Sequence, residues 1–287
     1  MAPRRVRLDV ALVQQGLEES RERARRLIVA GEVTVNGEVA TAPSSLVPEG
    51  AVLAVGKRLP YVSRGGLKLA HALDRFRIDP TGLVALDAGA STGGFTDCLL
   101  QRGARRVFAV DVGKGLLAWT LRQDPRVVVL EGRNVRYLVP GDLPQQVDLA
   151  TVDVAFISLR LVLPAIAGAT RPGGDVVALV KPQFEAGAAE VGKGGVVRDP
   201  AVHRRVLEGA LQGAREAGLV PAGLTASPIK GEAGNVEFLL WARRPAESEQ
   251  ESAQSDTTAL PELDEGAAVE GALTEAAAIA LPGRGRA

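Results

Sequence analysis

The chain has 287 residues, of which 46% are hydrophobic, and its 34 basic and 34 acidic side chains give no net charge. This length can hold two domains with buried cores. The single cysteine, Cys98, and two histidines exclude an internal disulfide and a His/Cys metal cage, and no stretch approaches the ~18 apolar residues of a membrane span, so we expect a cytoplasmic protein without metal or membrane.

The first sixty residues carry the pattern of a small α+β domain. The segment 7–13 predicts a short amphipathic helix, and Ser20 is an N-cap for a second, basic helix over 21–30. The strand-like run 33–39 surrounds Asn-Gly, which predicts a hairpin. Taken alone, the basic helix would fit a solvated surface equally well.

This order of elements resembles the small RNA-binding module named after ribosomal small-subunit protein four, over about residues 7–55. The resemblance implies RNA binding by Arg5, Arg7, Arg21 and Arg25. Arginine suits this role because its planar fork binds phosphate bidentately and keeps its charge. No aromatic residues are interleaved, so contacts should favour RNA backbone and shape over bases.

The segment 83–95 reads Leu-Val-Ala-Leu-Asp-Ala-Gly-Ala-Ser-Thr-Gly-Gly-Phe, a buried strand followed by a glycine turn and a helix start. Such a turn holds a nucleotide-like cofactor at the carboxyl edge of a parallel sheet. No lysine follows the glycines, as an NTP-binding loop requires, and the dinucleotide pattern is only half matched. The alternative is that this turn has a structural role only and binds no cofactor.

Two acidic residues distinguish between the possible cofactors. Asp87 ends the first strand, where it would repel a pyrophosphate but could pair with an ammonium group, and Asp111 ends the next, where a ribose diol would lie. The pair suits S-adenosylmethionine better than NAD. The cofactor-binding residues that we expect are Asp87, Gly89, Ser91, Thr92, Gly93, Gly94, Phe95, Asp111, Val112 and Asn134.

From residue 63 onward, strand-like and helical runs alternate over about 180 residues, which predicts a doubly wound, Rossmann-like α/β sheet. Ligands of such sheets bind beyond the carboxyl ends of the strands. The expected strands lie at 83–86, 107–110, 127–130, 149–152, 175–180, 223–226 and 236–242, and the expected helices at 67–76, 95–102, 116–122, 159–167 and 201–217.

Four charged residues fall where this topology would bring them together. Asp153 and Lys181 each end an apolar strand, Lys68 lies on the helix leading into the sheet, and Glu237 interrupts the last apolar run. A buried carboxylate needs a partner. Separate surface salt bridges are the alternative interpretation, but four such residues at one sheet edge favour a catalytic set.

This domain closely resembles the TlyA family of ribosomal RNA 2′-O-methyltransferases, which share the FtsJ-type core. The segments that carry the resemblance are Ser63–Leu69, Leu86–Thr96, Arg106–Gly113, Asp153–Ser158, Lys181–Glu185 and Gly234–Glu237. The resemblance implies a Lys-Asp-Lys-Glu tetrad at Lys68, Asp153, Lys181 and Glu237. It also implies S-adenosylmethionine as cofactor and methylation of cytidines in 23S and, in longer members, 16S rRNA. Arg64 and Arg136 are further RNA-binding candidates.

The residues suit this chemistry. Methyl transfer to a ribose 2′-hydroxyl is an in-line displacement, so alignment of oxygen, methyl and sulfur matters most. A lysine can accept the hydroxyl proton only in its neutral form. We assign Lys181 as the base or hydroxyl-orienting group, Asp153 as its partner, and Lys68 and Glu237 as supports. Which lysine is neutral is left open.

We therefore expect an RNA-binding domain over 1–57, a link over 58–62, a methyltransferase domain over 63–244 and a disordered acidic tail over 245–287, with at most a transient helix near 271–281. Residues 1–244 hold 32 basic and 25 acidic side chains, and the tail holds 2 and 9. A basic body suits a phosphate-rich partner such as ribosomal RNA. The link has Tyr61 where relatives have tryptophan, which puts linker-based coupling in doubt.

Three other functional classes compete with this interpretation. A nicotinamide dehydrogenase would need a cleaner glycine motif and a proton donor. A non-catalytic RNA-binding assembly factor could retain the same fold. A haemolysin-like, membrane-active protein is disfavoured because no membrane-spanning segment and no amphipathic segment of the membrane-surface type is evident. The modified nucleotides, the subunit preference, the role of the tail and the oligomeric state do not follow from the sequence.

Overall fold

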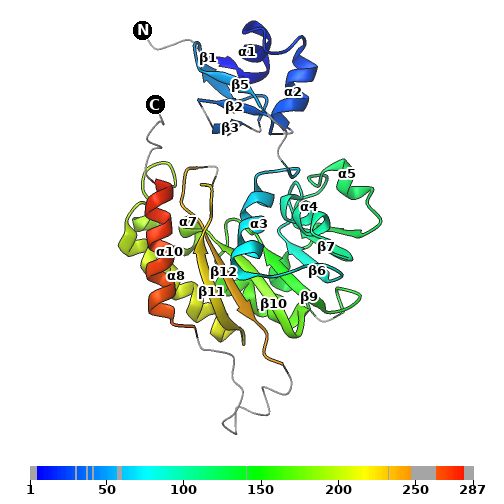
Figure 1. Cartoon of the computed structure of the whole chain (residues 1–287), viewed down its shortest axis with the longest axis vertical. Coiled ribbons are helices and arrows are strands. Elements are labelled where there is room, and N and C mark those ends of the chain that lie inside the picture. Colours follow the sequence, from blue (N-terminus) through cyan, green and yellow to red (C-terminus); the bar gives the residue numbers. More distant parts are fainter. Residues whose placement is uncertain are drawn as a thin grey trace. The chain divides into compact units, whose positions relative to one another are not determined.

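The computed structural model describes residues 5–246 except 30, 37, 41, 57–59, 140 and 232, and residues 263–280. The chain divides into two compact units, residues 1–66 and 67–287 (Figure 1). The expected boundary at 57–58, with Arg58 and Leu59 of the link, lies outside the described residues.

The first unit has the expected helices and hairpin. The Ser20 hydroxyl caps the second helix by accepting a hydrogen bond from the Arg23 amide at 3.2 Å. The hairpin pairs Val35 with Glu38, and Leu12 and Ile28 are fully buried between the elements. The elements of this unit are β1 (Arg5–Arg7), α1 (Leu8–Gln14), α2 (Arg21–Val29), β2 (Val33–Val35), β3 (Glu38–Ala40), β4 (Leu46–Pro48) and β5 (Leu53–Val55).

The second unit is built on a seven-stranded sheet. Its strands are β6 (Val84–Ala88), β7 (Arg106–Asp111), β8 (Val127–Glu131), β9 (Val147–Val152), β10 (Thr170–Val180), β11 (Val220–Ala226) and β12 (Phe238–Arg243). Its helices are α3 (Gly65–Phe76), α4 (Gly94–Gln101), α5 (Trp119–Arg122), α6 (Leu163–Ala169), α7 (Pro182–Glu185), α8 (Pro200–Glu216) and α10 (Glu265–Ala280), with short 3-10 helices η1 (Val135–Tyr137), η2 (Leu159–Leu161) and η3 (Ala188–Glu190).

The strand order is β11-β12-β10-β9-β6-β7-β8, and the five strands from β10 to β8 run parallel. The chain first moves outward from β6 to β8 and then returns to β9 on the other side of β6. The carboxyl ends of β6 and β9 therefore form the switch point at which doubly wound sheets bind ligands. This confirms the predicted α/β architecture, with β12 antiparallel between β10 and β11.

Helices cover both faces of the sheet. On one face α6 and α8 enclose a core that includes Leu86, Phe108 and Val152, all fully buried. Helix α3 packs on the other face, where the rings of Phe76 and Trp241 lie 5.6 Å apart (Figure 1). Cys98 is fully buried in α4, as expected for a core residue. The sheet is thereby rigidly held, and its carboxyl edge is left to the loops.

Two expected helices are shorter than predicted. The helix expected at 116–122 is only α5, because Leu117 is instead buried over the glycine loop and the Ala118 amide donates to the Thr92 carbonyl at 3.1 Å. The helix expected at 159–167 is divided into η2 and α6, and Pro164 lies in the first turn of α6. Proline is tolerated there because the first helical amides have no intrahelical partner.

The expectation of a wholly disordered tail is wrong for residues 265–280, which form α10. Val269, Ala272 and Ala276 are buried against the main core, and Arg204 and Arg215 of α8 pair with Glu270 and Glu265. The absence of aromatic residues suggested that the tail could bury too little surface to order. Small side chains, however, let the helix approach β11 and α8 closely.

Candidate active site at the carboxyl edge of the sheet

The structure brings Lys181 and Asp153 together. Asp153 directly follows β9 and Lys181 directly follows β10, which lies beside it in the sheet. Lys181 Nζ lies 2.6 Å from Asp153 Oδ1, and the two side chains are 14% and 22% exposed. An ammonium–carboxylate pair at this exposure is oriented by its surroundings and can still be reached by a ligand.

The other two residues of the expected tetrad form a second pair. Lys68, on the first turns of α3, contacts Glu237 Oε2, and both side chains are buried. The antiparallel register of β10 and β12 pairs Val180 with Phe238. Lys181 and Glu237 therefore follow and precede this pair at the same end of the sheet. The two lysine–carboxylate pairs belong to one sheet edge.

The glycine loop after β6 passes directly beside Asp153. Gly89 has φ of +90°, and a Cβ atom there would lie 2.3 Å from the Asp153 carbonyl oxygen. The Asp153 amide in turn donates to the Ala88 carbonyl at 2.9 Å. Only glycine lets β6 and β9 approach this closely at their ends, so Gly89 fixes the position of the Asp153 backbone at the switch point.

The start of α4 is packed just as tightly. Gly93, with φ of +97°, precedes the helix, and a Cβ atom on it would meet the Leu117 and Leu121 side chains at 2.8 and 2.3 Å. Gly94 and Phe95 are buried, while Ser91 and Thr92 are exposed at the loop tip. The loop therefore presents short polar side chains and backbone to a ligand, and buries its apolar residue.

Asp111 organises the neighbouring loops. Its two carboxylate oxygens accept hydrogen bonds from the Ser91 amide at 2.8 Å and the Gly113 amide at 2.6 Å. Val112 beside it is 64% exposed. Asn134, after β8, is exposed and accepts from the Arg136 amide at 3.0 Å. Acidic, apolar and amide groups thus follow β7 and β8 along the same edge.

Asp87 lies beneath the glycine loop, away from solvent. It is fully buried, and its Oδ2 accepts from the amide and hydroxyl of Thr96 at 2.8 and 2.6 Å. Its Oδ1 has no hydrogen-bond partner among the described residues. Burial, followed by the charge of Asp153, raises the pKa of Asp87 to about 7. Asp87 therefore ties β6 to the start of α4 rather than facing an ammonium group directly.

This burial predicts a pH dependence of stability. The pKa of Asp87 is about 7 in the folded chain and about 3.9 when unfolded, so the folded state holds the proton more tightly. Its contribution to stability is full below the unfolded value and is lost as pH rises towards the folded value. We expect Asp87→Asn to remove this loss of stability with rising pH.

Urea unfolding of both proteins at several pH values between 5 and 8 measures the effect. The stability of the variant relative to wild type should increase with pH, because asparagine cannot ionise. A difference that is constant over this range would contradict the assignment of a buried, proton-holding carboxyl to Asp87.

In the first unit, a buried aspartate gathers three of the predicted RNA-binding arginines. Asp9 is fully buried, and its carboxylate accepts hydrogen bonds from Arg7, Arg21 and Arg25 at 3.0–3.2 Å. The hydrogen bond from Arg7, together with those from Arg21 and Arg25, holds the pKa of Asp9 well below its usual range, against the opposing effect of burial. The arginine side chains are 41–53% exposed, so one charge holds three cations at the surface.

The remaining predicted RNA-binding arginines are not part of this group. Arg5 is exposed on β1, and Arg64 is half-buried in the turn before α3. Arg136 is exposed on η1, with its guanidinium carbon 5.5 Å from the centre of the Tyr137 ring. The arginines predicted to bind RNA therefore have different surroundings: three contact Asp9, and the others lie on β1, in the turn before α3 and on η1.

Comparison with known proteins agrees with this geometry. The FtsJ-like methyltransferase family matches residues 61–244, which include both lysine–carboxylate pairs and the glycine loop. The chain belongs to this family. The S4 domain family matches residues 6–53, which hold the Asp9 cluster.

Several relatives match this chain over most of their own length. The 16S/23S rRNA (cytidine-2′-O)-methyltransferase TlyA of Mycobacterium tuberculosis is 49% identical over 84% of this chain and 90% of its own. Hemolysin A of Brachyspira hyodysenteriae is 39% identical over 82% and 98%. A solved structure of a hemolysin-named protein from Streptococcus thermophilus is 42% identical, covers 97% of this chain and 98% of its own, and has a TM-score of 0.73.

In the described parts of this FtsJ-like chain, we find no helix with the length and apolar character needed to cross a bilayer.

No role was predicted for an aromatic pair at the edge of the methyltransferase domain. Phe156 has φ of +62° and is 91% exposed, and its ring centre lies 5.0 Å from that of Phe184. Lys181 Nζ lies 6.0 Å from the centre of the Phe184 ring. Glu185 holds the two loops together by accepting from the Ser158 hydroxyl and the Leu159 amide at 2.6 and 2.8 Å. The sequence feature that could have drawn attention to this ring is a phenylalanine three residues after an aspartate that ends a strand.

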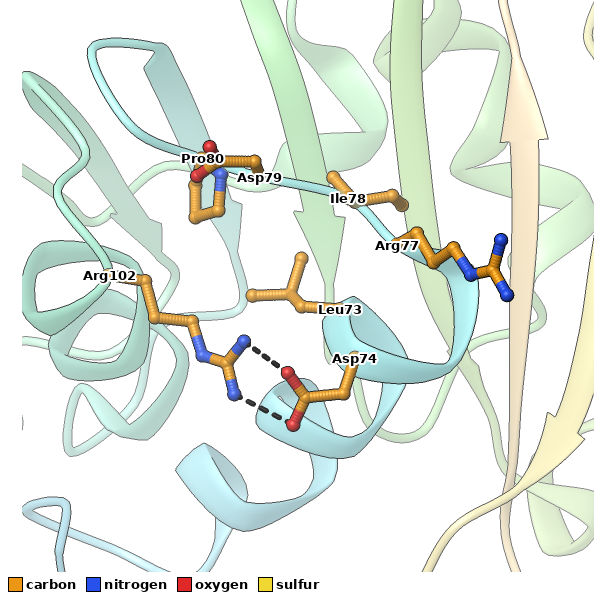
Figure 2. A pocket seen from close by; sticks show the side chains of 7 residues that line it. All are labelled: Leu73, Asp74, Arg77, Ile78, Asp79, Pro80 and Arg102. Atoms are coloured by element: carbon orange, nitrogen blue, oxygen red, sulfur yellow. Dashed lines mark hydrogen bonds and ion pairs between the residues drawn. The ribbon is translucent and has the colours of Figure 1, made fainter.

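A hollow of about 440 Å³ lies elsewhere, at the C-terminal end of α3 (Figure 2). Arg102 and Asp74 face each other across it in a bidentate ion pair at 2.6 and 2.9 Å. Pro80 at its margin leads into the beginning of β6, the sheet edge opposite to the tetrad. The hollow contains none of the expected site residues, and its central charges neutralise each other.

Proposed function

We propose that this protein uses S-adenosylmethionine to methylate the ribose 2′-hydroxyl of cytidines in 23S rRNA and also in 16S rRNA. The observation that carries the proposal is the pair of lysine–carboxylate contacts, Lys181–Asp153 and Lys68–Glu237, at one sheet edge beside the glycine loop. The name of the Mycobacterium tuberculosis relative, a 16S/23S rRNA (cytidine-2′-O)-methyltransferase, supports this substrate. Ribosomal RNA as substrate implies a cytoplasmic site of action.

The loop residues fit the proposed cofactor. Gly89 and Gly93 let the loop pack against the Asp153 backbone and the Leu117 and Leu121 side chains, where a Cβ atom would collide, so the loop backbone is held in place at the ligand-binding edge of the sheet. Asp111 supplies carboxylate oxygens for ribose hydroxyls, and the exposed Val112 supplies apolar surface for a base. Ser91, Thr92 and Asn134 offer further polar groups. When bound, S-adenosylmethionine supplies an electrophilic methyl group on a positively charged sulfur.

Lys181 is the residue we propose to act on the acceptor hydroxyl. Once the ammonium has released its proton to solvent, the amine would take the proton from the 2′-oxygen as that oxygen bonds to the methyl carbon and the bond between the methyl carbon and sulfur breaks. Asp153, 2.6 Å away, restrains the amine and turns it towards the edge of the sheet. Lys68 and Glu237 satisfy each other in the interior and hold α3 against β12. Alignment of the reacting atoms supplies most of the rate.

The exposed Phe156 ring is suited to hold the target base. Aromatic side chains stack on unpaired bases, at about 1–3 kcal/mol per base, and this ring lies next to Phe184 and thus near Lys181. We expect Phe156→Ala to reduce kcat/KM for RNA by about 5- to 150-fold, the range of this stacking energy. The affinity for S-adenosylhomocysteine should be unchanged.

Steady-state methylation with ribosomal subunits and titration calorimetry with S-adenosylhomocysteine check this expectation. Val220→Ala is the control, because Val220 is 40% exposed at the beginning of β11, the end opposite to the site. Equal loss of RNA and cofactor binding in Phe156→Ala would assign the ring to folding instead.

The S4 domain is proposed to deliver the RNA. The Asp9 cluster presents three arginine side chains that are 41–53% exposed and can therefore also contact phosphates. We expect the double variant Arg21→Ala, Arg25→Ala to weaken binding of all RNA sequences alike and to reduce the slope of log affinity against log salt by about 2. Filter binding at several salt concentrations measures both quantities.

Arg23→Ala is the matched control, because Arg23 lies on the same helix and pairs with Glu18 at 3.1 Å, away from Asp9. A salt slope that falls by the same amount in this control would show that the Asp9 cluster has no special part in binding.

Methylation of purified subunits tests the proposed function. The 30S and 50S subunits are incubated with methyl-labelled cofactor, and the modified nucleotide is mapped by its resistance to alkaline hydrolysis. Label in a cytidine ribose is expected. Binding of subunits without transfer of label would instead favour a non-catalytic assembly factor, and label on a base would overturn 2′-O-methylation.

A further inference from the structure

Helix α10 docks on the methyltransferase domain through an apolar stripe. Val269, Ala272 and Ala276 are each at most 5% exposed, and their spacing of three and four residues places them on one side of the helix. Figure 1 shows α10 running alongside α8 and β11. The stripe explains why the helix is bound, but an acidic residue on the same helix also reaches into the sheet.

That residue is Glu275. Its Oε2 accepts hydrogen bonds from the Thr225 hydroxyl at 2.6 Å and from the Ala226 amide at 2.9 Å. Strand β11 is the edge of the sheet, so an outward-facing amide there has no neighbouring strand to pair with. Thr225 is fully buried. A carboxylate that satisfies both donors fixes the end of β11 through charge-assisted hydrogen bonds.

The same carboxylate also lies at α3. The Thr225 hydroxyl is 3.3 Å from His71 Nε2, and Glu275 Oε1 is 3.8 Å from Arg75 Nη2. His71 and Arg75 are four residues apart, on one side of α3. Glu275 thus stands where α10, β11 and α3 meet.

Both members of the Lys68–Glu237 pair are attached to these elements. Lys68 lies on α3, three residues before His71. Glu237 accepts a backbone hydrogen bond at 2.8 Å from Ser227, the residue after Ala226. A displacement of α3 or of the end of β11 would therefore move one half of the pair relative to the other.

We propose that Glu275 is a positioning residue for the Lys68–Glu237 pair. It acts through Thr225 and His71 on the lysine, and through Ala226 on the glutamate. The inference rests on the proposed function of the site, and it assigns a role to a helix beyond residues 61–244 that the family profile covers. Because small misplacements of catalytic groups cost up to about 10²-fold in rate, we expect Glu275→Ala to lower kcat by about 10-fold.

Three full-length variants test the proposal: Glu275→Ala, Glu275→Gln and Glu270→Ala. Glutamine keeps an oxygen that can accept from Thr225 and Ala226, so it should restore most of kcat. Glu270 is the matched control, because it lies on the same helix and pairs with Arg204 of α8. The KM values for RNA and cofactor should stay within about twofold, since the substrate-binding loops are untouched. Equal kcat values for Glu275→Ala and Glu270→Ala would overturn the proposal.

A second measurement does not depend on activity. The chain has two histidines, and His203 is packed 5.5 Å from the Phe238 ring, so NMR of the imidazole groups follows each one separately. Glu275→Ala should shift the His71 signals and leave those of His203 in place, whereas Glu270→Ala should change neither. Unchanged His71 signals in Glu275→Ala would sink the proposal even with an active enzyme. An inactive wild type with shifted His71 signals would instead reject the proposed function alone.

Discussion

Lys181→Ala is expected to lower kcat for methylation of ribosomal subunits by about 10²- to 10⁴-fold, the range that a positioned general base contributes. The variant loses the amine that lies 2.6 Å from Asp153 and leaves that carboxylate without its cation. Because the Asp153 side chain is 22% exposed, water can solvate the remaining carboxylate and the fold should persist. The affinity for S-adenosylhomocysteine should change by only a few-fold.

Single-turnover kinetics with labelled cofactor and titration calorimetry separate these two quantities. Lys193→Ala is the control, since Lys193 is an exposed lysine in the loop after α7. Full methylation by Lys181→Ala would contradict the tetrad assignment. A comparable rate loss in the control would point to a general effect of removing positive charge on RNA binding.

Gly89→Ala is expected to abolish methyl transfer and to weaken S-adenosylhomocysteine binding by at least about 100-fold, or about 2.7 kcal/mol. The new Cβ atom would lie 2.3 Å from the Asp153 carbonyl oxygen, a distance that backbone atoms cannot accept. Alanine at φ of +90° adds roughly 1–2 kcal/mol of conformational strain. Strand β9 must therefore move away from β6, and the Lys181–Asp153 pair moves with it.

Gly218→Ala is the control that separates the effect of the steric collision from the effect of alanine at a positive φ. Gly218 also has a positive φ, +77°, but among the described residues other than its chain neighbours no atom lies within 4 Å of its Cβ position. It follows α8, away from the carboxyl ends of the parallel strands. Both variants should lower the unfolding temperature, and only Gly89→Ala should lose cofactor affinity. Retained affinity in Gly89→Ala would falsify the role of this close approach in shaping the site.

The main elements of the methyltransferase domain could be predicted from local patterns. A run of apolar residues of strand length, followed by a small-residue turn, needs no tertiary information to be recognised. The strand predictions at 107–110 and 149–152 fall within observed strands, and the prediction at 83–86 begins one residue before β6. The Asn-Gly hairpin in the first unit is also confirmed. Helix lengths were predicted less well, because Leu117 is used in packing over Gly93 instead of in a longer α5.

The direction in which a side chain faces was harder to predict. Asp87 was expected to meet the cofactor because it ends a strand at the ligand-binding edge. The structure buries it under the loop, where Thr96 holds it. Position in the sequence places a residue at the end of a strand, but packing of the following helix decides which side of the loop its carboxyl occupies. The exposed Phe156 is the opposite case, since large apolar side chains are usually buried.

The sequence by itself determined which residues carry charge at strand ends, where glycine permits a tight turn, and thus the α/β class and the candidate tetrad. Only the tertiary structure decided that Lys68 pairs with Glu237, 169 residues away, and that Glu275 of the acidic tail reaches the edge strand. The physical reason is that a local pattern fixes backbone conformation over a few residues. Partner choice depends on the surface that distant segments present, and that surface exists only once the sheet has formed.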